Sequence, residues 1–333
     1  RRDPYTPAGM DFELTDEQRL IQDTVRDFVD RKVLPNAVEN DIEHKLDMNV
    51  IEGMAELGLL GIVIPEEYGG AGLDFVAEAR SCEEIERGEA AFRTLISVHV
   101  GLNSLSLLRY ASEEQKQRYL VPQARGEKLA CFGLTEPAAG SDVASMLTTA
   151  RREGDTYVLN GQKNWISYAS VADHQLVFAK TDPAAKHKGI SAFVVERGWK
   201  GVTTQDTENK LGIWAGSTGE LFFENVEVPA ENMLGEEGQG FEIAMYGLAQ
   251  GRCKVAAGGC GFESVEDLAD ALDEAQNGVT LEWLRAGRWI REVSNRCDAC
   301  PTQSPRPKAS CSNAHRTSRR TRECPTSWSA SRA

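Results

Sequence analysis

The hydrophobic periodicity of this chain changes sharply near residue 128, and the change separates two kinds of structure. Before it, apolar residues such as Leu20, Ile21 and Val25 recur at helical spacing behind Thr15, the expected N-cap. After it, β-branched and aromatic runs alternate with Gly, Asp, Asn and Pro over about 100 residues, as in strands joined by turns. Helical spacing then returns over 238–257. The sequence therefore predicts an α+β multidomain chain with a helical domain followed by a β-domain.

We expect four segments along the chain. The last one has almost no aliphatic residue after Val293, so it cannot bury enough apolar surface to offset the entropy of ordering. The expected segments are an N-terminal α-helical domain over 10–127, a middle β-domain (barrel or sandwich) over 128–233, the incomplete start of a C-terminal helical domain over 234–277, and a disordered basic tail, rich in Cys, Arg and Ser, over 278–333. Their patterns predict helices over 50–60, 75–88, 92–110, 112–125 (opened by a capping box of Ser112 and Gln115) and 265–275, and strands over 157–159, 175–179, 190–195 and 220–228.

The charge of the chain argues against nucleic acid as its main partner. The 333 residues carry a formal net charge of −14. Residues 284–333 hold eleven Lys or Arg and three Asp or Glu, which leaves −22 for residues 1–283. Phosphate is repelled by an acidic surface of this kind.

Three features favour a cytoplasmic protein without a membrane span. No run of 18 apolar residues is present. Residues 1–9 lack the apolar core of a signal peptide, and Met10 is the expected start. Cys82, Cys131, Cys253 and Cys260 sit singly in apolar surroundings, as buried reduced thiols do.

Two segments of the β-rich part carry the strongest functional signal. The first, Cys-Phe-Gly-Leu-Thr-Glu-Pro-Ala-Ala-Gly-Ser-Asp over 131–142, is a tight turn with the hydroxyls of Thr135 and Ser141. The second, Asn-Gly-Gln-Lys-Asn-Trp-Ile-Ser over 160–167, ends a strand on Trp165. Hydroxyl and backbone N–H groups suit the polar edge and pyrophosphate of a flavin, and an indole suits its face. Taken alone, the first segment is more typical of a surface hairpin.

Together the two segments resemble the FAD-binding region of the acyl-CoA dehydrogenase family, and the likeness extends from about Phe12 to about Gly261. The resemblance implies a flavoprotein oxidoreductase of fatty acid metabolism that converts an acyl-CoA thioester to the trans-2-enoyl-CoA and passes electrons to an electron-transfer flavoprotein. Relatives form homo-oligomers, an assembly that we consider doubtful for this chain. The FAD contacts that the resemblance implies are Phe132, Leu134, Thr135, Gly140, Ser141, Trp165 against the isoalloxazine, Ile166, and Ser167 near flavin N5.

The resemblance also implies three substrate-binding residues. Ser141 lies on the thioester side of the implied pocket, and Arg252 matches an arginine that supports it. Arg93 lies in a segment similar to the one that binds the distal carboxylate in glutaryl-CoA dehydrogenases, and a guanidinium pairs well with a carboxylate. A plainer interpretation of Arg93 is a surface arginine on a helix. The sequence around Arg252 is equally compatible with an ordinary helix that the glycines at 247 and 251 interrupt.

The catalytic base is unknown from the sequence. The implied reaction needs a carboxylate against the substrate α-proton. Some branches of the family carry this glutamate where Gly251 stands here, and others carry it far downstream. No segment of 262–333 resembles the family's downstream segment that carries the glutamate. The carboxylates available there lie in sequences unlike that segment; they are Glu266, Glu274, Glu282 and Glu292. We therefore expect impaired activity. The alternatives are a non-catalytic remnant that only binds, or a partner-binding protein that uses its basic tail.

Cysteine and histidine residues in the tail superficially resemble zinc ligands. They are Cys297, Cys300, Cys311, His315 and Cys324. The later pair lacks the compact spacing of a zinc finger, and no apolar scaffold surrounds it. A shifted reading frame of a GC-rich gene gives the same composition, so we expect no metal.

Overall fold

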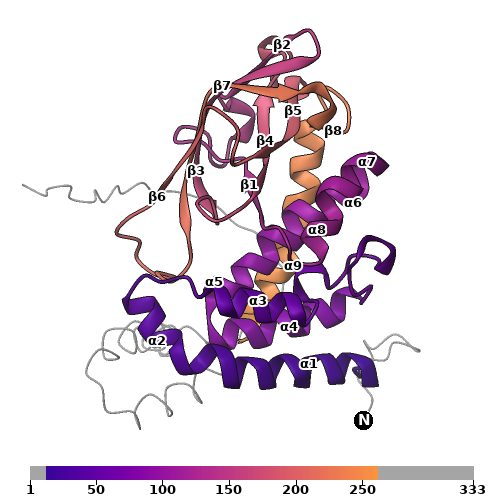
Figure 1. The fold of residues 1–333 in the computed structure, drawn as a ribbon, viewed down its shortest axis with the longest axis vertical. Coiled ribbons are helices and arrows are strands. Elements are labelled where there is room, and N and C mark those ends of the chain that lie inside the picture. Colours follow the sequence, from indigo (N-terminus) through magenta and orange to yellow (C-terminus); the bar gives the residue numbers. More distant parts are fainter. Residues whose placement is uncertain (1–12, 262–333) are drawn as a thin grey trace, which may run out of the picture. The chain divides into compact units, whose positions relative to one another are not determined.

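The structure, a computed structural model, describes residues 13–261 of the chain (Figure 1). The expected helix over 265–275, the basic tail and the zinc candidates lie outside the described residues. Within 13–261, helices occupy the first part and strands the middle, and α9 follows them. The predicted fold class is therefore confirmed.

Helices make up the described chain as far as Ala124. Two of them begin with capping boxes, one at the predicted N-cap Thr15 and one at the predicted capping box of Ser112. Thr15 and Gln18 exchange side-chain and backbone hydrogen bonds, and so do Ser112 and Gln115. The helices are α1 (Asp16–Phe28), η1 (Val29–Val33), α2 (Leu34–Ile42), α3 (Met48–Glu56), η2 (Leu59–Gly61), η3 (Glu66–Tyr68), α4 (Phe75–Gly88), α5 (Ala90–Leu95), η4 (Ile96–Ser104), α6 (Leu105–Tyr110), α7 (Glu113–Gln115), η5 (Lys116–Leu120) and α8 (Val121–Ala124).

One helical run, Ala90–Tyr110, is long and apolar enough to cross a membrane. It comprises α5, η4 and α6, and 72% of its apolar window is buried inside the protein. Burial of this extent is typical of the core helix of a domain. No other helix within 13–261 meets the same criteria.

The strands form one eight-stranded sheet in the order β6-β7-β3-β2-β4-β5-β8, with β1 paired in parallel to β4. Its longest pairing joins β3 and β7, which run antiparallel with two irregularities in register. The strands are β1 (Ala130–Gly133), β2 (Thr149–Glu153), β3 (Thr156–Ser167), β4 (His174–Lys180), β5 (Ile190–Glu196), β6 (Val202–Asp206), β7 (Thr218–Pro229) and β8 (Met233–Leu234). Short 3-10 turns connect some of them; these are η6 (Val143–Ser145), η7 (Pro183–Gly189) and η8 (Ala230–Asn232).

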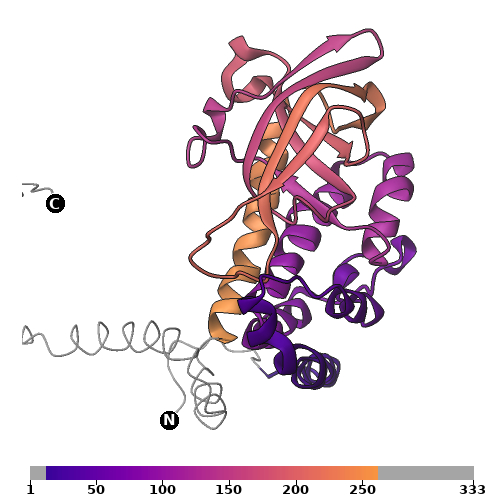
Figure 2. The ribbon, with the colours of Figure 1, turned by 60° about the vertical axis from the view of Figure 1, so that its left-hand side comes forward.

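Helix α9 (Gly240–Gly261) runs from the sheet into the helical layer, as both ribbon views show (Figures 1 and 2). It packs on β5 at its start and on α4 and η4 further along. Glycines make the close approach possible: a Cβ on Gly247 or Gly251 would lie within 3.2 Å of Leu102. The glycines at 247 and 251 of α9 therefore face η4.

One face of α9 packs against the helical layer, and this explains why two cysteines of α9 are exposed although they were predicted to be buried. Gly251, Lys254 and Gly258 lie on this packed face. Cys253 and Cys260 lie off it and are exposed, so the prediction that they are buried is wrong. Cys82 and Cys131 are buried free thiols, as predicted.

Candidate functional site

The two segments predicted to bind a flavin lie side by side. The backbone N–H of Asn164 donates to the carbonyl oxygen of Thr135 across 2.9 Å. Glu136 and Ala139 close a tight turn through two backbone hydrogen bonds of 3.1 Å. Thr135 therefore lies beside the end of β3 that carries Trp165, and the exposed Ser141 follows the turn.

Trp165 has an unusual backbone conformation and an exposed side chain. Its φ is 60°, a region that bulky residues rarely adopt. The register of β3 against β7 shifts between Lys163 and Ile166, and the Asn164 side-chain oxygen accepts the Trp165 N–H at 2.7 Å. The bulge leaves the indole 62% exposed. A large apolar ring fixed in the open by a strained backbone suits a face that a planar ligand covers.

The other predicted cofactor contacts divide into exposed and buried residues. Gly140 has open space where a Cβ would stand, and Ser167 is partly exposed. Phe132, Leu134 and Ile166 are buried, and the Phe132 ring packs on Phe178 with a centroid distance of 4.9 Å. The three buried residues can therefore meet a cofactor mainly through their backbone groups.

A buried ion pair joins the two segments, and the sequence analysis did not predict it. Lys163 Nζ lies 2.7 Å from Glu136 Oε1, and neither side chain is more than 4% exposed. A signal was present in the burial pattern of β3, where Lys163 is buried like the apolar positions Tyr157, Leu159 and Ile166. A lysine at an inward strand position requires a buried partner, and Glu136 is that partner.

The environment of this pair keeps both groups charged near neutral pH. Burial lowers the pKa of Lys163 to about 8, although Glu136 opposes the change. Burial also tends to raise the pKa of Glu136, but Lys163 and the backbone N–H groups of Leu147 and Thr148 hold it below the usual value. At pH 7 the pair is thus an ammonium and a carboxylate.

Arg93 is buried rather than exposed, so its interpretation as a surface arginine is wrong. Its side chain is 11% exposed and forms an ion pair with the buried Glu86. It also donates to Ser97 Oγ at 3.3 Å. A Cβ on Gly258 of α9 would lie 3.0 Å from Arg93 Nε, so the arginine faces the helix that carries Arg252. Arg252 itself is exposed.

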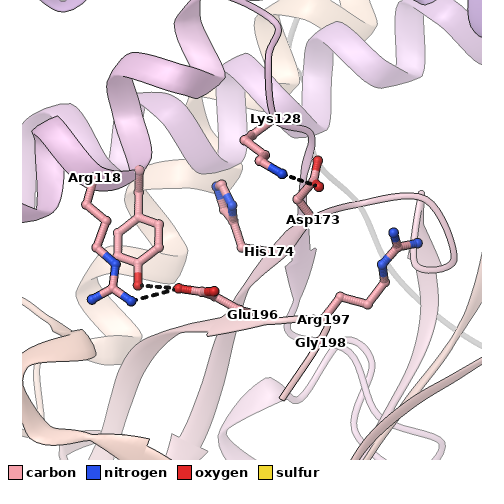
Figure 3. A pocket seen from close by; sticks show the side chains of 8 residues that line it. Arg118, Lys128, Asp173, His174, Glu196, Arg197 and Gly198 are labelled. Carbon is pink, nitrogen blue, oxygen red and sulfur yellow. Dashed lines mark hydrogen bonds and ion pairs between the residues drawn. The ribbon is translucent and has the colours of Figure 1, made fainter.

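A pocket of about 470 Å³ is lined by residues outside these segments, among them Arg118, Asp173 and Glu196 (Figure 3). Lys128 and Asp173 flank the start of β1, whereas Thr135 follows its end. Two ion pairs line the pocket: Lys128 contacts Asp173 at 3.0 Å, and Arg118 contacts Glu196 at 2.9 Å. Arg197, a further lining residue, donates to the Ser170 carbonyl oxygen. Because neither Thr135 nor Trp165 lines it, this pocket is a poor candidate for the flavin site.

No group of three or more His, Cys, Asp or Glu residues within 13–261 has the arrangement of a metal site. The predicted zinc candidates of the tail lie outside this range.

Comparison with known proteins identifies two consecutive family domains. Residues 15–127 match the family model "Acyl-CoA dehydrogenase, N-terminal domain", and residues 131–226 match "Acyl-CoA dehydrogenase, middle domain". The short-chain specific acyl-CoA dehydrogenase of Clostridium acetobutylicum is 45% identical over 84% of this chain and 75% of its own length. The mitochondrial short-chain specific acyl-CoA dehydrogenase of Rattus norvegicus is 43% identical over 80% of this chain and 64% of its own. The chain thus spans about two thirds to three quarters of these relatives.

Solved structures show the same similarity. A chain described as electron transferring flavoprotein of Acidaminococcus fermentans matches with a TM-score of 0.77 and 38% identity, over 86% of this chain and 78% of that one. A glutaryl-coenzyme A dehydrogenase in complex with glutaryl-CoA matches with a TM-score of 0.74 and 44% identity, over 76% of this chain and 65% of that one.

Proposed function

This chain belongs to the acyl-CoA dehydrogenase family, and from that premise we propose that it oxidises an acyl-CoA thioester to the trans-2-enoyl-CoA with FAD as cofactor. The observation that carries the proposal is the hydrogen bond between Asn164 and Thr135, which brings the two flavin segments together. Similar solved structures include acyl-CoA dehydrogenases with FAD or FADH2 bound. The residues present fit such a cofactor, because they offer an exposed indole, hydroxyls and open backbone in one region.

Each residue of the proposed flavin site has a distinct role. Trp165 would cover a face of the isoalloxazine, and the hydroxyls of Thr135 and Ser167 would meet its polar edge. Ser141, with the backbone beside Gly140, would hold the pyrophosphate. When bound, FAD supplies the acceptor for the hydride that leaves the β-carbon of the substrate. The protein residues bind and orient both partners.

The carboxylate that removes the α-proton stays unassigned. Gly251 cannot take a proton, and the carboxylates at 266, 274, 282 and 292 lie outside the described residues. Loss of a general base typically lowers a rate 10²–10⁴-fold. Three predictions therefore stay open: the activity is impaired, the chain is a remnant that only binds, or it binds a partner through its tail.

We further propose that the acyl group carries a carboxylate at its far end. Arg93 is the group that would bind it, supported by Glu86 and Ser97. A buried guanidinium held by a carboxylate is oriented for such an anion. The similarity to a glutaryl-CoA complex at 44% identity agrees with this choice, and the equal similarity to a short-chain specific relative at 45% identity makes an unsubstituted short chain the alternative.

Partners and location complete the proposal. We propose an electron-transfer flavoprotein as the electron acceptor, and the similarity to the Acidaminococcus fermentans structure supports it. The cytoplasm stays the predicted compartment, supported by the free thiols of Cys82 and Cys131. The oligomeric state stays a prediction.

The proposed activity is tested by adding acyl-CoA to the purified full chain under anaerobic conditions and following the flavin absorbance. We expect glutaryl-CoA to bleach the flavin faster than butyryl-CoA. The double variant Arg93→Gln/Glu86→Gln removes both charges and should reduce this preference roughly 100-fold, because the carboxylate loses its partner. Arg118→Gln/Glu196→Gln, at an ion pair far from the flavin segments, is the control. A chain that takes up FAD but is bleached by neither thioester contradicts the activity.

A further inference from the structure

The buried ion pair of Lys163 and Glu136 connects the two flavin segments in the interior of the protein. Glu136 follows Thr135 directly, and Lys163 precedes Trp165 by two residues on β3. Lys163 Nζ contacts Glu136 Oε1 at 2.7 Å and donates to the Leu134 carbonyl at 3.2 Å. One ammonium therefore ties the end of β3 to the end of β1.

The pair also has little freedom to move. Glu136 Oε1 accepts the N–H of Thr148 at 3.0 Å, and Oε2 accepts the N–H of Leu147. The Thr148 hydroxyl in turn donates to the Gln162 carbonyl at 3.4 Å. Every carboxylate oxygen and the ammonium have protein partners, so the geometry is fixed by the fold rather than by solvent.

We propose that Lys163 and Glu136 are positioning residues for FAD, which hold Thr135 and Trp165 at the spacing that the flavin requires. The inference rests on the proposed function. Lys163 is completely buried, so it acts through the segments that it joins. Because Trp165 leaves the strand at a bulge next to Lys163, a small shift of β3 moves the indole relative to Thr135.

A purely structural role is the alternative, and the chain contains a matched control for it. Lys254 Nζ lies 2.9 Å from Glu78 Oε2, and both side chains are 2% exposed. This second pair joins α9 to α4 and has the same chemistry and burial as the first. It contacts neither flavin segment. Loss of either pair should therefore affect stability, but only the first should affect the flavin.

The experiment compares two double variants of the full chain, Lys163→Met/Glu136→Gln and Lys254→Met/Glu78→Gln. Both charges are removed together, because a single substitution would leave an unpaired buried ion. Such an ion would destabilise the fold whatever the role of the pair in flavin binding. The readouts are the FAD dissociation constant from a fluorescence titration and the reduction potential of the bound flavin. For the first double variant we expect FAD to bind about tenfold or more weakly, with a changed potential. For the second we expect an FAD affinity within about threefold of the unchanged chain, as for a site with no shared contacts.

Two results would overturn the inference: an FAD affinity and potential unchanged in Lys163→Met/Glu136→Gln, or an equal loss in Lys254→Met/Glu78→Gln. If the first double variant does not fold, the milder Glu136→Gln is judged by the same criterion, because it keeps the shape and one acceptor. Failure of the proposed function is a distinct outcome, in which the unchanged chain does not bind FAD.

Discussion

Glu89 offers a quantitative test of how burial shapes this fold. It precedes α5, and both of its carboxylate oxygens are buried without a hydrogen-bond partner among the described residues. Burial raises the pKa of Glu89 from 4.5 to about 8, and the nearby charges of Asp41 and Asp47 raise it further in the same direction. A carboxyl group with a raised pKa stabilises the fold only while it is protonated.

The change Glu89→Gln removes the charge and keeps the shape. The stability that the protonated carboxyl provides is complete below pH 4.5 and is lost as the pH rises through about 8. At 1.36 kcal/mol per pKa unit, the full difference is about 5 kcal/mol. Partial solvent access reduces this value, so we expect about 3 kcal/mol.

The assay is thermal unfolding of both proteins at pH 5 and pH 8.5. We expect Glu89→Gln to exceed the unchanged chain by less than about 1 kcal/mol at pH 5 and by about 3 kcal/mol at pH 8.5. Glu56→Gln, at an exposed glutamate of α3, is the control for the substitution itself. An equal gain at the two pH values, or none at pH 8.5, would show that burial of the Glu89 carboxyl does not make the stability of the fold depend on pH.

Three further substitutions test the packing and polar contacts of the helical part by thermal unfolding. Gly61→Ala places a Cβ 2.3 Å from the Ala124 carbonyl oxygen and should destabilise the fold by about 1–3 kcal/mol; an unchanged melting temperature contradicts the close contact. Lys254→Met alone leaves Glu78 buried without its partner and should cost about 3–5 kcal/mol, more than the double variant with Glu78→Gln. Thr15→Ala removes the capping box of α1 and should cost about 1 kcal/mol, whereas Thr15→Ser should cost less.

Local chemistry made much of the fold predictable from the sequence. The capping boxes at Thr15 and Ser112 fixed two helix starts, because the same side chains satisfy N–H groups in any context. The predicted helix over 75–88 coincides with α4. β2 was missed because its sequence, Thr-Ala-Arg-Arg-Glu, is charged and mostly exposed, and only its pairing with β3 makes it a strand.

The two segments of the candidate site could be predicted from the sequence, but the buried ion pairs near them could not. Thr135 and Trp165 belong to two recognisable segments of the sequence, and the structure places those segments together. The pairing of Lys163 with Glu136 spans 27 residues and depends on how β1 and β3 meet, which no local pattern encodes. The burial of Arg93 likewise depends on α9, which follows about 150 residues later in the chain.

A titration of the purified full chain with FAD, followed by flavin fluorescence, tests directly whether the two segments form a flavin site. We expect saturable binding with strong quenching, because the exposed indole of Trp165 would stack on the flavin ring. Trp165→Ala should weaken binding and remove most of the quenching, whereas Trp214→Ala, whose indole packs on His44, should leave both unchanged. Absence of FAD binding, or equal quenching in Trp165→Ala, would contradict a flavin site at these two segments.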